Sequence, residues 1–144
     1  MNPKQQSSDL VSENLYYELL NFALDVSNAL GIRLDYSNDS IKLVEKILSN
    51  MHYEYKKTKD EKGLNGIALE FAAYIVEVIR RNSDEKGMWY RDHAIFGEKS
   101  FPFNWKGEAL FPYSWCKKRI FDGEADDVYF KYKSIVLPKM NADQ

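Results

Sequence analysis

Apolar residues recur every three or four positions through most of the first 82 residues, which is the spacing of amphipathic helices. A first helix is predicted over residues 9–30, and Gly31 suits the position just after a helix. Its predicted buried face consists of Leu15, Leu19, Phe22, Val26 and Leu30. Its predicted solvent face carries Asn14, Glu18, Asn21, Asp25 and Asn28.

Two further helices follow. The second begins after Ser37, whose hydroxyl suits an N-cap. Its predicted apolar face is Ile41, Val44, Ile47, Leu48, Met51 and Tyr55, and its predicted wet face is Lys42, Glu45, Lys46, Asn50, Lys56 and Lys57. The third helix, over residues 64–82, is apolar around most of its circumference, which indicates burial on nearly all sides. Its polar strip is Glu70, Ala73, Glu77, Arg80 and Arg81.

The spacing of apolar residues along the chain changes after residue 87. Short aromatic-rich runs at 88–91, 94–96, 100–103 and 108–111 predict three or four antiparallel strands, with Lys106-Gly107 closing the last hairpin. Pro102 favours an edge position for its strand, because proline cannot donate to a ladder. Two short helices are predicted over 112–122 and 126–136, the second ending before Pro138. The predicted fold class is therefore α+β.

Length and composition indicate one globular domain over residues 9–138, with tails at 1–8 and 139–144. The net charge is −2, so no overall basic bias favours nucleic acid or anionic lipid. The chain has one cysteine and no long apolar run, and its first nine residues are polar. These features predict a cytoplasmic protein that does not enter a membrane.

A near-repeat marks the aromatic region. Phe101-Pro102-Phe103-Asn104-Trp105 returns ten positions later as Phe111-Pro112-Tyr113-Ser114-Trp115. Proline holds the preceding residue extended, so each copy can be a turn that folds its rings into a core. The alternative interpretation is a paired aromatic platform for a ligand, peptide or base.

Two carboxylates lie seven residues apart on the third helix, and so on one face of it. Glu70 and Glu77 could perform acid–base chemistry in a small enzyme, if their surroundings separated their pKa values. Arg80 and Arg81 lie within one turn of Glu77, which favours an ion pair that braces the helix. We expect the bracing role.

Other reactive side chains have weak patterns. His93 lies near Asp92 and Glu98, and His52 is far away in sequence, so no metal-binding spacing is formed and we expect neither a metal nor a cofactor. His93 is expected in a turn. Cys116 has three basic neighbours that would lower a thiol pKa, but a free cysteine without a nearby base is more often a buried apolar residue.

A partner surface is predicted where rings and cations alternate. Its expected residues are Phe101, Phe103, Trp105, Lys106, Lys117 and Lys118. Trp105 beside the Lys106-Gly107 turn is the expected anchor, and Trp115, one turn into a helix, is expected in the core. The same 99–119 region could instead bind single-stranded nucleic acid, although the acidic residues that directly follow argue against this.

Four runs also carry a resemblance: Leu34-Asp35-Tyr36-Ser37, the helix segment 73–81, Trp89, and residues 111–119 with Gly123. Over about residues 34–136 the chain resembles a group of small uncharacterised bacterial cytoplasmic proteins. Some of these occur near secreted-toxin loci, so the resemblance implies an immunity-type role. Val76 stands where the group is expected to have glycine. We therefore expect a non-catalytic binding protein with another protein as partner and toxin immunity as its specific role.

Overall fold

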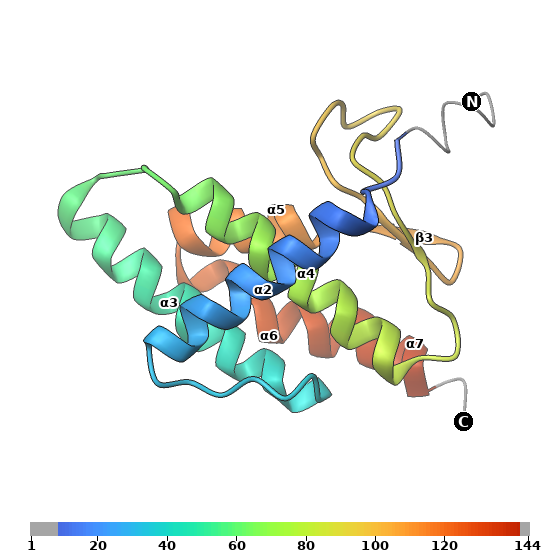
Figure 1. Cartoon of the computed structure of the whole chain (residues 1–144), viewed down its shortest axis with the longest axis horizontal. Coiled ribbons are helices and arrows are strands. Elements are labelled where there is room, and N and C mark those ends of the chain that lie inside the picture. Colours follow the sequence, from blue (N-terminus) through green and yellow to red (C-terminus); the bar gives the residue numbers. More distant parts are fainter. Residues whose placement is uncertain (1–8, 142–144) are drawn as a thin grey trace.

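A computed structural model describes residues 9–141 of the 144-residue chain. The tail predicted at residues 1–8 lies outside the described residues, as do residues 142–144. The α+β class is confirmed: three helices precede a small antiparallel sheet, and short helices follow it (Figure 1). The three first helices are α2 (Glu13–Ala29), α3 (Ile41–Thr58) and α4 (Leu64–Asn82), with a 3₁₀ turn η1 (Asn38–Ser40) before α3.

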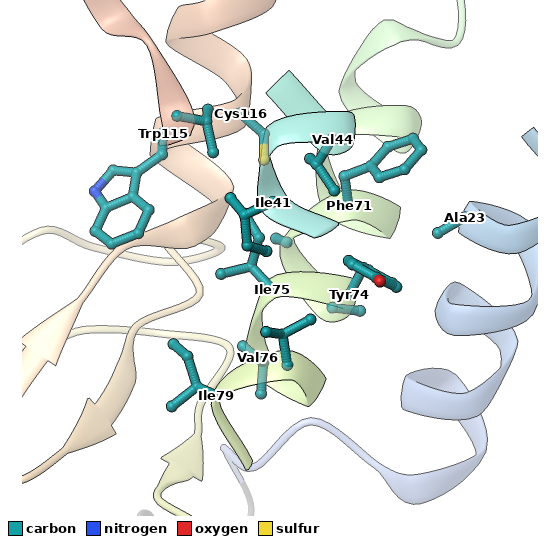
Figure 2. Packing of buried hydrophobic residues seen from close by; sticks show 14 of the residues in the cluster. Ala23, Ile41, Val44, Phe71, Tyr74, Ile75, Val76, Ile79, Trp115 and Cys116 are labelled. Atoms are coloured by element: carbon teal, nitrogen blue, oxygen red, sulfur yellow. The ribbon is translucent and has the colours of Figure 1, made fainter. Parts of the chain in front are cut away.

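Helix α4 forms the centre of the core. It has the predicted bounds, and α2 lies in front of it in Figure 1 while α5 (Pro112–Phe121) lies behind. Figure 2 shows Ile75, Val76 and Ile79 of α4 facing other apolar side chains, and all three are fully buried. Ala73, which the sequence placed on the polar strip, is also fully buried. Because α4 is apolar around almost its whole circumference, other elements can pack on several of its sides at once, and they do so in this structure.

The predicted buried face of α2 is only partly right: Leu19 is buried and Val26 packs against the core, as expected. Leu15, Phe22 and Leu30 are exposed, and the residues that pack inward are Tyr16, Leu19, Leu20, Ala23 and Ser27. The small side chains of Ala23 and Ser27 are fully buried and leave room for close approach to the neighbouring structure. A prediction based on hydrophobic periodicity gives such small residues little weight. It therefore assigned the larger apolar side chains of α2 to the buried face.

The sheet contains β1 (Met88–Trp89), β2 (Phe103–Trp105) and β3 (Glu108–Leu110), antiparallel and in that order. The Lys106-Gly107 turn is confirmed, and both residues have positive φ angles of 51° and 79°. Such angles are typical of the two-residue turns that match the twist of a hairpin.

Two strand predictions are wrong. Residues 94–96 form turns and not a strand, and β2, which follows Pro102, is the central strand and not an edge. Pro102 lies just before the first residue of β2, so its missing N–H takes no hydrogen bond from the ladder. Its carbonyl still accepts a hydrogen bond from the Tyr90 amide.

The C-terminal segment does not end before Pro138. Helix α6 (Val128–Lys131) continues through a π-helical turn η3 (Tyr132–Val136) into α7 (Leu137–Asn141). Pro138 is the second residue of α7, which directly follows the π-helical turn, so it does not end the helix. Residues 139–141, predicted to begin a tail, therefore belong to a helix, and Met140 is buried in the core.

Candidate functional site

The predicted partner surface divides into a buried half and an exposed half. Phe101, Phe103 and Trp105 are only 6%, 0% and 0% exposed, so none of them offers a ring to a partner. The expectation that Trp105 lies free at a hairpin tip is wrong. Its Nε1 donates to the Ser83 hydroxyl and to the Glu85 carbonyl, each at 3.1 Å. These bonds fold the hairpin onto the turn that follows α4.

Lys106 belongs to the same folded-down hairpin. Its backbone N–H donates to the Glu85 carboxylate, and its ammonium group donates to the Lys139 carbonyl at 3.2 Å. The ammonium also lies 5.4 Å from the centre of the Trp105 ring. Lys106 therefore joins the hairpin to α7 and does not face the exposed half of the region.

The exposed half forms a groove of about 760 Å³ between residues 96–100, the first turns of α5, and the α6–η3 segment. We call it the basic groove. Its lining consists of Phe96, Glu98, Lys99, Ser100, Phe111, Tyr113, Ser114, Trp115, Lys117, Lys118, Lys131 and Ile135. Of the residues predicted for a partner, Lys117 and Lys118 line it. None of the other lining residues is among the six that were predicted for the partner surface.

Four lysines and four aromatic rings give the basic groove its chemistry. The Lys117 ammonium lies 5.1 Å from the centre of the Tyr113 ring, which is a cation–π contact. Lys131 is partly neutralised by Asp126, with Nζ 3.1 Å from the carboxylate. Glu98 is the one acidic residue of the lining. The groove is thus locally basic on a chain whose net charge is −2.

The backbone around the basic groove is unusual. Lys99 has a positive φ of 58°, and nearby Phe101 has a φ of 52°. Ile135, which also lines the groove, belongs to the π-helical turn η3. Positive φ at ordinary residues and π turns both cost stability and are frequent at functional sites. Their presence around one groove marks it as the candidate site.

His93 is a turn histidine, as predicted. Its Nδ1 accepts the N–H groups of Ile95 at 3.0 Å and Phe96 at 3.2 Å. The Asp92 carboxylate is also used internally, because it accepts the Lys99 N–H at 2.9 Å. In the described residues, 9–141, no group of histidine, cysteine and acidic side chains could hold a metal ion.

The basic run 117–119 does not form one solvated face. Arg119 is buried and its Nε lies 2.9 Å from the Glu45 carboxylate of α3, which the sequence had assigned to a wet face. Cys116 is fully buried, and burial raises the pKa of its thiol rather than lowering it. This environment does not activate a nucleophile.

Both carboxylate oxygens of Glu77 have partners on the protein. One Glu77 oxygen accepts the Tyr16 hydroxyl at 2.6 Å and the other accepts Arg81 Nε at 2.8 Å. Arg80 does not join this pair: its Nε donates to the Lys86 carbonyl, and its guanidinium lies over the Tyr16 ring. The predicted partner of Glu77 is thus Arg81, with Tyr16 as a partner that the sequence did not reveal.

Glu70 lies apart from this network. It is half-buried, desolvation raises the pKa of its carboxyl group, and within the described residues it has no hydrogen-bond or ion-pair partner. A second cavity of about 330 Å³ is lined by Glu77 and Arg80, among others, but not by Glu70. Glu70 therefore does not line the cavity that Glu77 and Arg80 share.

Comparison of the chain with family models, curated proteins and solved structures finds no match in any of the three. None of the helices formed by residues 9–141 combines the length and the apolar character needed to cross a bilayer.

Proposed function

We propose that this protein is a non-catalytic binding protein whose basic groove holds an acidic segment of another protein. The observation that supports this proposal most directly is the gathering of Lys99, Lys117, Lys118 and Lys131 with aromatic rings in one open groove. Cations attract carboxylates, and aromatic rings beside them can pack against the apolar parts of the same segment.

The charges around the groove favour a short acidic segment over a nucleic acid strand. Arg119 is withdrawn into the core, and Glu98 lies within the lining. On the connection from α5 to α6, Asp126 pairs with Lys131 of the groove, and Glu124, two residues before Asp126, is exposed. A phosphate backbone that extended beyond the groove would meet these carboxylates, whereas a short acidic segment fits between them.

The resemblance to small bacterial cytoplasmic proteins supports one physiological form of this binding. Under this proposal the partner is a secreted toxin, and the protein neutralises it in the cytoplasm of the producing cell. The product of an adjacent toxin-like gene is the partner to test first, by co-purification and calorimetric titration.

Binding through the groove can be tested without the natural partner. The probe is a fluorescein-labelled peptide of alternating glutamate and serine, measured by anisotropy beside a single-stranded oligonucleotide of similar charge. The double variant Lys117→Glu/Lys118→Glu should weaken peptide binding by about tenfold or more, and added salt should weaken binding to the unaltered protein. The control is Lys46→Glu, an exposed lysine on α3 that does not line the groove.

Equal affinity of the double variant and the control would overturn the proposal. Tighter binding of the oligonucleotide than of the acidic peptide would assign the groove to nucleic acid instead.

A further inference from the structure

Two large apolar side chains lie exposed at the edge of the basic groove. Ile95 is 81% exposed and Phe96 is 67% exposed, and they are the two most exposed large apolar residues described in the chain. Single exposed apolar residues are common on protein surfaces, but two neighbours at one loop tip form a compact apolar patch. We call this pair the apolar tip.

The backbone beneath the apolar tip is held in place by hydrogen bonds. His93 and Gly97 exchange two backbone hydrogen bonds of 2.9 Å, which closes a tight loop. Inside that loop, His93 Nδ1 accepts the amides of both tip residues. The Ser100 hydroxyl adds a bond of 2.8 Å to the Gly97 carbonyl. A loop fixed in this way loses little conformational entropy when it binds.

The apolar tip is continuous with the basic groove. Phe96 lines the groove, and its ring packs edge-on against Phe111 with 5.2 Å between the ring centres. Lys99 lies three residues along the same loop and also lines the groove. A chain bound to the lysines therefore passes next to an exposed and pre-organised apolar patch.

We propose that the segment bound in the basic groove carries a large apolar side chain beside its acidic run, and that this side chain packs on Ile95 and Phe96. This inference rests on the proposed function and names the partner's chemistry: carboxylates for the lysines, and a leucine or phenylalanine for the apolar tip. Aromatic residues are enriched among the side chains that supply most of the binding energy in protein interfaces.

The test compares two labelled peptides. One alternates glutamate and serine, and the second is identical except that two serines at one end are replaced by phenylalanine. The unaltered protein should bind the second peptide about fivefold to tenfold more tightly. Ile95→Ser should remove most of this preference and leave the affinity for the first peptide unchanged, because Ile95 is not part of the groove lining.

Matched variants make the result specific. Phe96→Ser is the second tip variant, and Phe22→Ser replaces an exposed ring on α2 that does not line the groove. Phe22→Ser should keep the full preference for the phenylalanine peptide. An equal preference in the Ile95→Ser, Phe96→Ser and Phe22→Ser proteins would overturn the inference while leaving groove binding intact. If neither peptide binds the unaltered protein, the proposed function itself fails.

Discussion

Arg119 of α5 and Glu45 of α3 form an enclosed ion pair in which Arg119 Nε lies 2.9 Å from both carboxylate oxygens. The two side chains are only 3% and 15% exposed. The same carboxylate accepts the Val128 amide at the start of α6, at 3.0 Å. This one pair therefore links the helices that carry two walls of the basic groove.

Removing one partner of this pair should destabilise the protein strongly. Arg119→Met leaves the largely enclosed Glu45 carboxylate without its cation, which should lower the free energy of unfolding by about 3 kcal/mol or more. The measurement is urea denaturation followed by circular dichroism. Lys118→Met is the matched control, since its exposed side chain should matter by less than about 0.5 kcal/mol.

The double variant Arg119→Met/Glu45→Met provides the decisive comparison. Because it removes both charges, it should recover much of the stability lost by Arg119→Met alone. A double variant no more stable than the single one would show that the arginine contributes mainly through its packing and not through charge pairing.

Trp105 should behave as a core residue. Trp105→Ala removes a fully buried indole and the hydrogen bonds to Ser83 and Glu85, so it should cost about 3–5 kcal/mol. Thermal melts of Trp105→Ala and Trp115→Ala should both show large decreases. If the Trp105→Ala protein melts within a few degrees of the unaltered protein, the hairpin is not packed against the turn after α4.

The elements that the sequence predicted best are those with the strongest local signal. Helix α4 has the predicted bounds because its apolar run leaves no competing face, and the Lys106-Gly107 turn requires positive φ that glycine readily adopts. The buried face of α2 was predicted only in part, because its inward stripe includes the small residues Ala23 and Ser27 beside Leu19. Hydrophobic periodicity gives most weight to large apolar side chains. It does not register that small side chains allow two elements to pack closely.

The candidate site was only half predictable. Lys117 and Lys118 stand out in the sequence, but Lys131 and Ile135 join them across the groove from another helix. Lys131 and Ile135 are four residues apart and so lie on one helical face. The sequence around them does not show which other element that face packs against. Trp105 was misplaced for a similar reason, because its partners Ser83 and Glu85 lie about twenty residues away.

Glu70 should make the protein less stable at neutral pH than a neutral residue would. Burial raises the pKa of its carboxyl group above the ordinary 4.5, so folding disfavours the ionised form. Glu70→Gln should therefore raise the melting temperature at pH 7, by about 1–2 °C for a half-exposed group. The measurement is a thermal melt of both proteins at several pH values.

The stability difference between Glu70→Gln and the unaltered protein should depend on pH in a defined direction. As pH falls through the raised pKa, the folded unaltered protein takes up a proton at Glu70 and gains stability relative to its unfolded state. The advantage of Glu70→Gln should shrink over this range and vanish below the ordinary pKa that the carboxyl group has in the unfolded chain. A Gln variant that melts lower at pH 7 would mean that the ionised carboxylate has a stabilising partner.

Glu77 should be coupled more strongly to Tyr16 than to Arg81. The Tyr16–Glu77 hydrogen bond is short and partly buried, and burial together with this carboxylate raises the pKa of the phenol. The Arg81 side chain is 52% exposed, so solvent screens its ion pair with Glu77. Double-mutant cycles should give about 1–2 kcal/mol for Tyr16→Phe with Glu77→Gln, and under about 0.5 kcal/mol for Arg81→Gln with Glu77→Gln.

The sign of the single Glu77→Gln change separates a brace from a catalytic carboxylate. A brace predicts a loss of stability, because the amide cannot pair with Arg81 and accepts a weaker hydrogen bond from Tyr16. A carboxylate kept for chemistry at the expense of stability predicts the reverse, a variant that melts higher than the unaltered protein. Melts of Glu77→Gln beside Glu70→Gln decide between them: we expect the first to fall and the second to rise, although both remove one negative charge from the same helix.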